Sequence, residues 1–413
     1  MNAPRPPLMS LDDALVELLR CASVVPGVES VSTFEADGRV LAQDLISPLH
    51  VPAHDNSSMD GYAVRCADVL QAQARSQGVL PVTQRIAAGS GGAALAPMSV
   101  ARVFTGAPIP AGADAVVMQE DCEVLESGAL RIKAVPAPGQ WVRRAGEDVT
   151  QGAVVLSQGQ RLTPAALGLA ASIGLDRLPL VRRPRVALFS TGDELVMPGA
   201  VVPEQMKPGA IYNSNRFFLR ALLLRLGCAV SDLGIVPDRL DATLDALRGA
   251  AQGHDLILTS GGVSVGEEDH IKPAVKALGR LDLWQIAIKP GKPFAYGRVQ
   301  DCHFIGLPGN PVSSFVTFLL LVRPFLLKLQ GVAQREPASI ALPAHFSWTK
   351  ADKRREFLRV RRNAAGGLDL FANQSSGVLT SAAWADGLVD NPPGQTISAG
   401  EVVRFIPFAE LLG

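Results

Sequence analysis

The sequence D-L-I-L-T-S-G-G-V-S-V-G-E-E-D, residues 255–269, decides the expected fold. Residues 255–260 form a short apolar run, which is typical of a strand buried on both faces of a parallel sheet. Ser260 closes the run, and Gly261 and Gly262 follow it. Because glycine adopts backbone conformations that other residues avoid, the chain can turn sharply there and bring bare backbone N–H groups close to a ligand.

Three carboxylates come after the glycine turn, at Glu267, Glu268 and Asp269, and a helix is expected at 271–278. A glycine turn between a strand and a helix is a place where an anion can bind. The neighbouring carboxylates would repel a bare anion, so a divalent cation between the two is the simplest way to accommodate both. The stretch therefore predicts a phosphorylated ligand and a metal ion.

The same alternation of apolar runs and amphipathic segments extends over residues 182–330. Strands are expected at 185–190, 229–236, 255–260, 283–288 and 303–307, and helices at 214–226, 240–251, 271–278 and 312–329. Strands and helices that alternate at this spacing predict an open, mostly parallel, doubly wound sheet with helices on both faces.

Polar and glycine-rich segments follow each expected strand of this sheet. They are Thr191–Glu194, Pro237-Asp238, Ser260–Asp269, Lys289–Pro293, and Pro308–Pro311 with Ser313. In open parallel sheets the ligand crevice lies at the carboxyl ends of the strands. Ordinary turn chemistry is the simpler explanation of any single loop. Five such loops at one edge, with acidic and basic groups together, favour a ligand site.

The overall composition excludes several classes of function. Lys plus Arg equals Asp plus Glu at 39 each among 413 residues, so no global field steers the chain onto nucleic acid or an anionic membrane. Five widely spaced cysteines without a C-x-x-C motif indicate neither a zinc knuckle nor a disulfide framework. The first residues lack the apolar core of a signal peptide, and the apolar run at 315–322 is too short to span a bilayer. We therefore expect a cytoplasmic protein.

The chain is too long for one core, and changes in composition and in apolar pattern along it predict four domains. We expect a discontinuous N-terminal domain (1–51 and 149–180), an inserted, mainly β domain (52–148), the doubly wound domain (181–332) and a C-terminal β-barrel domain (333–413). A helix near 9–21 has Ser10 as its candidate N-cap. A second helix begins at Thr163-Pro164, and we expect it to pack against the first.

Four clusters outside the doubly wound domain allow two interpretations each. The segment P-A-H-D-N-S-S-M-D-G-Y-A-V (52–64) is either an Asx-rich turn or part of a site. Arg143 and Arg144 form either a surface ion-pair turn with the acids that follow or a clamp for an oxyanion. The basic run at 351–362 is most simply a solvated face, since nucleic-acid binding would need interleaved aromatics. Ser375-Ser376-Gly377 is either a tight turn or an anion-binding nest.

Six motifs occur in one order along the chain: N-S-S-M-D-G-Y-A-V, F-T-G-A-P-I-P-A-G-A-D, S-T-G-D-E-L, S-G-G-V-S-V-G-E-E-D, K-P-G-K-P and G-L-P-G-N-P-V-S. With these motifs the sequence closely resembles the molybdopterin molybdenumtransferases, the family that includes the E domain of gephyrin. The resemblance runs from about Leu8 to the C-terminus. It implies four domains, an elongated homodimer and a magnesium-dependent reaction. In that reaction adenylylated molybdopterin (adenylyl-molybdopterin) is cleaved, AMP leaves and molybdate enters the dithiolene.

The resemblance also implies which residues act. Catalytic roles fall to Asp60, Thr105, Asp148, Asp193 and Glu194, and substrate binding to Arg143, Ser260, Gly261, Gly262, Lys289, Lys292, Pro308, Ser313, Arg355, Arg359 and Ser376. Asp238 and Asp269 are the expected Mg²⁺ ligands, because this hard ion prefers oxygen. The backbone N–H groups of Gly261 and Gly262, with the two lysines, would hold phosphate or molybdate. Family sites lie between the doubly wound domain of one subunit and the inserted and C-terminal domains of its partner.

Two rival functions remain open at this point. A binding scaffold would keep the fold and present a groove to a partner protein, but it has no physical need for the carboxylates and both lysines. The adenylyltransferase that charges molybdopterin resembles residues 182–330 alone and needs neither flanking domain. The sequence leaves open whether the protein docks onto other molybdenum cofactor synthesis proteins, and whether tungstate competes with molybdate.

Overall fold

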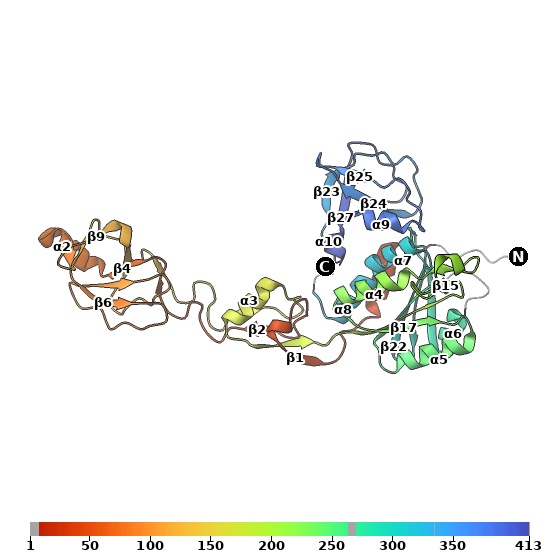
Figure 1. Ribbon diagram of the computed structural model, residues 1–413, viewed down its shortest axis with the longest axis horizontal. Helices are drawn as coiled ribbons and strands as arrows, with labels where there is room; N and C mark the ends of the chain where they lie inside the picture. The colour runs from red at the N-terminus through yellow and green to blue at the C-terminus, as the bar shows by residue number, and fades with distance from the viewer. Residues whose placement is uncertain (1–7, 263–269, 334, 413) are drawn as a thin grey trace.

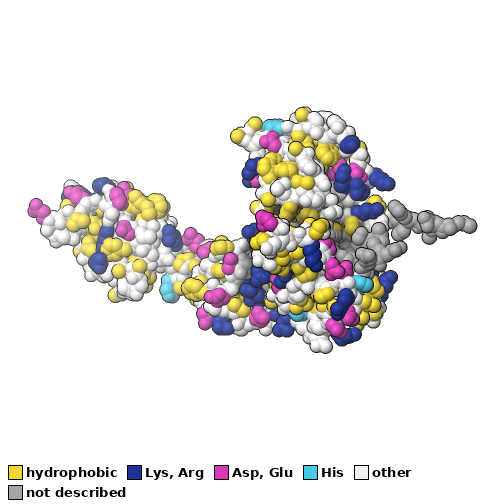
Figure 2. Space-filling model, turned by 45° about the vertical axis from the view of Figure 1, so that its right-hand side comes forward, with side chains coloured by type: hydrophobic (Ala, Val, Ile, Leu, Met, Phe, Trp, Pro, Cys, Tyr) yellow, Lys and Arg dark blue, Asp and Glu magenta, His cyan; other side chains and the backbone are white. Residues whose placement is uncertain are grey.

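The computed structural model describes residues 8–262, 270–333 and 335–412 of the chain. The molecule is elongated, with a small β lobe at one end and a narrow segment that contains β1, β2 and α3 in the middle. The doubly wound sheet lies at the other end, with the C-terminal domain against its side (Figure 1). Basic and acidic side chains are interspersed over the face in Figure 2, in keeping with the balanced composition.

The doubly wound domain is built on a six-stranded sheet of order β17-β14-β18-β22-β21-β19. Its strands are β14 (Arg185–Thr191), β17 (Ala229–Val236), β18 (Leu256–Ser260), β19 (Gly279–Gln285), β21 (Pro293–Val299) and β22 (Cys302–Leu307). The first four neighbours in this order pair in parallel, and β21 and β19 pair antiparallel at one edge. The mostly parallel, doubly wound sheet is thereby confirmed. Strand β21 follows the lysine-bearing loop and was not expected.

Helices cover both faces of this sheet. They are α4 (Asn215–Arg225), α5 (Leu240–Ala251), α6 (Ile271–Leu278), α7 (Pro311–Thr317) and α8 (Arg323–Leu329), with a π-helical turn, η4 (Phe318–Val322), between the last two. Alternate strand residues explain the two layers, because side chains along a strand point to opposite faces. Val186 and Leu188 pack with α4, α7 and α8, whereas Ala187 and Phe189 pack with α5 and α6. A small pair, β15 (Leu195–Val196) and β16 (Ile211–Tyr212), and the short helix η3 (Pro203–Gln205) lie beyond β14.

The N-terminal helix α1 (Leu11–Arg20) begins at Ser10, whose side chain accepts a hydrogen bond from the Asp13 N–H. The expected N-cap is confirmed, but the expected partner of the helix is wrong. Leu11 and Leu18 are buried in the same core as α8, and α1 contacts that helix. The helix α3 (Pro164–Ser172) packs in a separate core with β12 and η1. The apolar face of α1 therefore extends the layer that covers the doubly wound sheet.

The middle segment joins distant parts of the chain by short antiparallel pairs. Strand β1 (Val28–Ser32) pairs with β13 (Arg177–Val181), and β2 (Leu45–Ile46) with β12 (Val154–Leu156); η1 (Thr33–Glu35) lies between β1 and β2. Val51 and Val149 form an isolated antiparallel bridge with hydrogen bonds of 2.8 and 3.1 Å. The chain therefore enters and leaves the inserted domain at the same place.

The inserted domain has a four-stranded sheet of order β6-β7-β4-β8 and a three-stranded sheet of order β5-β10-β9. Their strands are β4 (Gly61–Val64), β5 (Val79–Leu80), β6 (Val82–Ile86), β7 (Val100–Val103), β8 (Ala115–Met118), β9 (Cys122–Val124) and β10 (Leu130–Ile132). A separate pair is formed by β3 (Asn56–Ser57) and β11 (Val142–Arg143). A short turn of helix, η2 (Gln119–Asp121), follows β8. Helix α2 (Cys66–Ser76), which sequence analysis missed, packs Val69 and Ala72 into the core between these sheets.

The C-terminal domain is an open mixed sheet, and the expected closed β barrel is corrected. Its order is β20-β24-β26-β27-β23, with β25 beside β24. The elements are β20 (Ile288–Lys289), β23 (Ile340–Pro343), β24 (Arg355–Arg362), β25 (Leu368–Leu370), β26 (Gly387–Asn391), β27 (Val402–Pro407), α9 (Leu379–Trp384) and α10 (Phe408–Leu412). The two ends of the curled sheet meet only through one isolated bridge between Ala344 and Leu368.

One helical stretch, Pro311–Leu329, is long and apolar enough by composition to cross a membrane. Its most apolar window is 83% buried within the protein. Phe318, Val322 and Phe325 contribute to the core that covers the doubly wound sheet. The stretch is therefore explained as a core helix, and the described residues contain no second candidate span.

Candidate active site

The strand order of the doubly wound sheet reverses between β14 and β18. The chain passes from β14 to β17 on one side and then crosses back to β18 on the other side of β14. A crevice opens at such a switch point because the two connections leave in opposite directions. The stretch at 255–262, from which the fold was predicted, ends at this point of the structure.

Gly261 and Gly262 both have positive φ, at 91° and 67°, so the turn after β18 requires glycine. A Cβ on Gly261 would lie 3.1 Å from the Thr191 carbonyl oxygen. The Gly261 N–H, expected to hold an anion, instead donates to the Leu307 carbonyl at 3.1 Å. The N–H of Gly262 has no acceptor among the described residues. The expected anion nest is therefore reduced at this turn to a single free N–H group.

The Pro308–Pro311 loop lies against the glycine turn. A Cβ on Gly309 would lie 3.9 Å from the Gly261 Cα, and the Asn215 side-chain amide at the start of α4 donates to the Gly309 carbonyl at 2.8 Å. Ser313, in the first turn of α7, is only 5% exposed. The structure thus brings the loops after β18 and β22 together and places Ser260, Pro308 and Ser313 around them.

Two of the expected acidic residues lie beside each other across β14 and β17. The Asp238 N–H donates to the Asp193 side chain at 3.4 Å. Neither carboxylate has a basic partner in the described part of the chain. Glu194 folds back on Gly192 and lines, with Asp193 and Lys207, a pocket of about 500 Å³.

These carboxylates fit a magnesium ion by their chemistry, since they are hard oxygen donors and neither Asp193 nor Asp238 forms an ion pair among the described residues. Asp269, the other expected ligand, lies outside the described residues. In residues 8–262, 270–333 and 335–412 no group of three or more His, Cys, Asp or Glu side chains is placed to hold a metal. The described residues therefore supply part of a ligand set.

The loop with the two lysines is shared between two domains. Strand β20 pairs in parallel with β24, so Lys289 lies directly opposite Glu356 of the C-terminal domain. The Lys289 ammonium lies 2.9 Å from Glu356 Oε1 and 3.3 Å from Asp352 Oδ2. Burial lowers the pKa of Lys289, but the bonds and charges of these carboxylates outweigh it and raise the pKa overall. Lys289 is therefore a protonated contact between domains.

Glu356 is 1% exposed, and the Trp348 indole N–H donates to its second oxygen at 2.8 Å. Lys292 in the same loop is half-buried and has no carboxylate partner among the described residues. Between the lysines, Gly291 has a φ of 117°, and a Cβ there would lie 2.4 Å from the Thr317 hydroxyl oxygen. The loop is thus pressed against α7, and Lys292 remains the cation free to bind an oxyanion.

Ser376 also reaches the crevice of its own chain. The Val312 N–H in the first turn of α7 donates to the Ser376 carbonyl at 3.0 Å. The C-terminal domain therefore contributes Ser376 and the Glu356 contact to the doubly wound domain of the same subunit. This differs from the expectation that the partner's C-terminal domain would do so.

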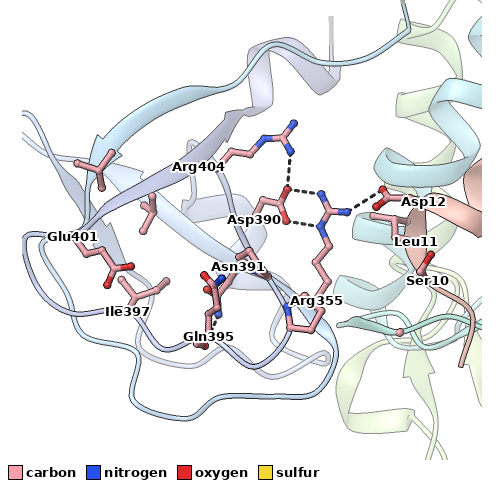
Figure 3. Close-up of a pocket in the computed structure, with 15 residues that line it drawn as sticks. Ser10, Leu11, Asp12, Arg355, Asp390, Asn391, Gln395, Ile397, Glu401 and Arg404 are labelled. Carbon is pink, nitrogen blue, oxygen red and sulfur yellow. Dashed lines mark hydrogen bonds and ion pairs between the residues drawn. The ribbon is translucent and has the colours of Figure 1, made fainter.

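Arg355 is engaged in an ion network away from Lys289. Its guanidinium donates to both oxygens of Asp390, at 2.6 and 2.7 Å, and to Asp12 of α1 at 3.0 Å. Figure 3 shows Arg355 between these two carboxylates, with Arg404 on the far side of Asp390. Three of the five N–H groups of Arg355 are engaged in these contacts, so the structure shows it as an interdomain ion pair, and its expected role in substrate binding stays a prediction.

Arg359 is 1% exposed and lies inside the C-terminal domain. It donates to Ser381 Oγ at 3.2 Å and to the Phe357 carbonyl at 2.9 Å, while its second terminal nitrogen has no partner among the described residues. Burial lowers the pKa of Arg359 to about 10. In this arrangement its guanidinium is inaccessible to an oxyanion in the crevice, contrary to expectation.

The inserted domain brings together two pairs of expected residues. Asp60 Oδ1 accepts hydrogen bonds from the backbone N–H and the hydroxyl of Thr105, at 2.8 and 2.9 Å, and these bonds lower the pKa of Asp60. Arg143 and Asp148 line one pocket of about 460 Å³ with Glu147 at the exit of the domain. Arg144 instead forms an ion pair with Asp55 at 2.6 Å.

The structure does not bring these pairs to the crevice of the same chain. The lobe with Asp60 and Thr105 lies at the opposite end of the molecule from β14 and β18 (Figure 1). Sequence analysis missed Glu356, Asp352 and Trp348 around Lys289. Glu356 lies within the basic run at 351–362, but no local pattern indicates that it pairs with a lysine 67 residues away.

Open, mostly parallel sheets of this class bind ligands at the carboxyl ends of their strands, and here that edge carries a glycine turn, carboxylates and a loop with two lysines. Three family models match in chain order: the MoeA N-terminal region (domain I and II) over residues 9–174, a probable molybdopterin binding domain over 187–328, and the MoeA C-terminal region (domain IV) over 341–408. Together with the similarities below, they show that the chain belongs to the molybdopterin molybdenumtransferase family.

A molybdopterin molybdenumtransferase of Haemophilus influenzae is 40% identical over 98% of this chain and 100% of its own length. One of Synechococcus elongatus is 38% identical, covering 95% of this chain and 98% of that protein. A crystal structure of a molybdopterin biosynthesis MoeA protein from Pyrococcus horikoshii has a TM-score of 0.80 and 31% identity, over 97% of this chain and 99% of that one.

Proposed function

We propose that this protein is a molybdopterin molybdenumtransferase that cleaves adenylylated molybdopterin, releases AMP and inserts molybdate into the dithiolene. The observation that carries the proposal is the position of Gly262, the Asp193–Asp238 pair and Lys292 at the same edge of the sheet, where the parallel strands end. Family membership and this site together favour a transferase over a scaffold. A single-domain adenylyltransferase is disfavoured because the family models match both flanking regions.

Each group has a physical task in this reaction. Molybdate is a tetrahedral dianion, so a lysine ammonium and a backbone N–H that suit phosphate suit it as well. Lys292 and Gly262 would hold that oxyanion, and Asp193 and Asp238, with Asp269, would hold magnesium. Bound Mg²⁺ withdraws charge from phosphate oxygens. Glu194 lines the same pocket as Asp193 and would orient the attacking oxygen.

We also propose that a second copy of the chain completes the site. Asp60 and Thr105 lie in the inserted domain and Arg143 and Asp148 at its exit, so one chain alone does not bring them to its own crevice. A closed dimer would let the lobe of each subunit reach the crevice of the other. We further propose a cytoplasmic location, because five free cysteines suit a reducing compartment.

The proposal is tested by following AMP release from adenylylated molybdopterin with magnesium and molybdate. We expect magnesium-dependent release by the wild type and its loss in Asp238→Ala and Asp269→Ala. Asp241→Ala is the matched control, since this exposed aspartate pairs only with nearby Arg239. Absence of AMP release by the folded wild type would refute the enzyme and favour a scaffold.

Mixed dimers test the shared site separately. Asp60→Ala and Asp238→Ala subunits would each be inactive alone, but a heterodimer would contain one site free of both changes. Random exchange should restore about a quarter of wild-type activity, because about half the dimers are mixed and each has one intact site. Failure to recover any activity after verified exchange would contradict a site shared in this way.

A further inference from the structure

A row of basic and aromatic side chains crosses the four-stranded sheet of the inserted domain. The register pairs Arg85 of β6 with Arg102 of β7, and Arg102 with Tyr62 of β4. Phe104 follows Arg102 by two residues, so the two side chains point to the same side of the chain. The four side chains therefore form one continuous patch, defined here as the arginine patch.

Two guanidinium groups of this patch lie against one phenyl ring. The central carbon of the Arg85 guanidinium is 4.5 Å from the centre of the Phe104 ring, and that of Arg102 is 5.1 Å from the same ring. Arg102 also lies 4.9 Å from the ring centre of Tyr62. These distances are typical of cation–π interactions. Both guanidinium groups contact the Phe104 ring, so this ring keeps the two cations close to each other.

Neither arginine of the patch forms an ion pair among the described residues. Other arginines of the inserted domain do: Arg65 with Asp68, Arg131 with Glu123 and Arg144 with Asp55. Arg102 donates only to the Gln119 side chain, and Arg85 is exposed with no hydrogen-bond acceptor in the described part of the chain. Two like charges without a carboxylate between them repel each other, and a bound anion would offset this repulsion.

The patch adjoins the Asp60–Thr105 pair. Asp60 precedes Tyr62 by two residues on β4, and the charge of Arg102 adds to the hydrogen bonds of Thr105 in lowering the pKa of Asp60. Asp60 accepts both bonds from Thr105 at Oδ1, and Glu120 accepts a bond from the Gln119 side chain that Arg102 also contacts. The planar N–H edges of the arginines match phosphate oxygens, which a lysine ammonium would contact less specifically.

We propose that Arg85 and Arg102 form a phosphate-binding site on the inserted domain, which takes a phosphate monoester or a diphosphate. The inference rests on the proposed function in one respect only: the patch would hold a phosphate of the adenylylated substrate while Asp60 and Thr105 face its reacting end. Phe104 positions the two guanidinium groups by stacking.

Equilibrium binding of pyrophosphate and of AMP to the full-length protein, measured by calorimetry without molybdate, tests the site. Arg85→Ala and Arg102→Ala should each weaken pyrophosphate binding about tenfold, as expected for the loss of one charge-assisted hydrogen bond. Arg131→Ala, which removes an arginine that already pairs with Glu123, should leave the affinity unchanged. Arg102→Lys should fall between wild type and alanine, because it keeps the charge and loses the fork.

Inorganic phosphate and adenosine separate the possible sources of the ligand. Weaker binding of pyrophosphate, AMP and inorganic phosphate alike in both variants would assign the patch to any phosphate, whereas loss for AMP alone would assign it to the nucleotide. Equal affinities of wild type, Arg85→Ala and Arg102→Ala for all four probes would overturn the proposal. Because no turnover is measured, this result is independent of AMP release, on which the proposed function depends.

Discussion

The lysine loop and the Asp60–Thr105 pair carry expected site residues in opposite kinds of surroundings. Lys289 lies between two domains, against a glutamate that is 1% exposed and an indole N–H. Asp60 lies on an exposed turn of a separate lobe and is held by one neighbouring threonine. The lysine loop is therefore part of what holds the domains together, whereas Asp60 is supported by its own lobe alone.

Because of this difference, we expect mutations around Lys289 to change the stability of the fold and mutations at Asp60 to change activity alone. A change around Lys289 removes partners from buried groups of two domains, so the fold responds along with the chemistry. A change at Asp60 removes an exposed carboxylate and leaves the core of the lobe intact. Mutations in the two regions should consequently have different signatures: a loss of stability around Lys289, and a loss of activity alone at Asp60.

Glu356→Ala should have the largest effect. It removes the carboxylate 2.9 Å from the Lys289 ammonium, which keeps only Asp352 at 3.3 Å among the described residues, and it leaves the Trp348 indole N–H without an acceptor beside a new cavity. We expect a loss of about 3 kcal/mol in the free energy of unfolding. Denaturant unfolding followed by fluorescence measures it. Glu123→Ala, which breaks the exposed pair with Arg131, should cost less than about 0.5 kcal/mol. Equal losses would remove the distinction between the two regions.

Asp60→Ala should lower the rate of AMP release about a hundredfold or more, the range typical of a group that acts at the reacting atoms. The thermal midpoint of unfolding should stay at the wild-type value, because the side chain is exposed and its partner Thr105 can bind water. Kinetic assays of AMP release check the lower rate, and thermal denaturation of the same preparation checks the unchanged midpoint. A destabilised Asp60→Ala protein would show that the lobe depends on this residue for its fold.

Acid should weaken the doubly wound core through His303. Burial, with the charge of Arg298, lowers the pKa of His303 from 6.5 to about 4. The folded state therefore binds fewer protons than the unfolded state between these values, and stability is lost as the pH falls from about 6.5 towards 4. We expect His303 to account for about 2 kcal/mol between pH 7.5 and 5.

Urea unfolding of the wild type and of His303→Gln, each at pH 7.5 and pH 5, isolates the contribution of His303. The variant should lose less stability on acidification than the wild type. Tyr296→Phe removes the hydroxyl 2.9 Å from His303 Nδ1 but keeps the buried imidazole, so it should retain the wild-type slope. An unchanged slope in His303→Gln would contradict the assignment.

Ser376→Ala should have the smallest effect on stability, within about 0.5 kcal/mol, because the contact with Val312 uses the Ser376 carbonyl rather than its hydroxyl. Calorimetric titration with molybdate distinguishes the two remaining roles of the residue. A weaker affinity at unchanged stability would assign the hydroxyl to the oxyanion. An unchanged affinity would limit Ser376 to its backbone contact.

Local patterns predicted the elements of the doubly wound domain well. Helices α5 and α6 and strand β17 occur at the expected residues, because apolar periodicity, glycine stops and short connections act within one element. Strand β21 was missed because Pro290, Gly291 and Pro293 indicate a loop, and the strand begins only at the last of these. The polar loops at the carboxyl ends followed from the strand assignment itself.

Contacts between distant segments could not be predicted in the same way. The basic run at 351–362 indicates a charged surface, but nothing local distinguishes Arg355, which pairs with Asp390, from Arg359, which is buried. The amphipathic face of α1 predicts burial and leaves its partner open, and the partner proved to be α8. The C-terminal strands likewise left open whether their sheet closes, and only one bridge joins its ends.

The bridge between Val51 and Val149 has a consequence for how such a chain can change over time. Since both crossings are adjacent, the whole inserted lobe could be removed and replaced by a tight turn with little disturbance to the strands on either side. Loss or exchange of ninety-odd residues at that neck would be a single event that removes Asp60 and Thr105, which we propose as part of the active site, and leaves the crevice of the doubly wound sheet in place. A protein of this architecture could thereby lose its catalytic activity and keep a binding role, while the rest of its fold stays unchanged.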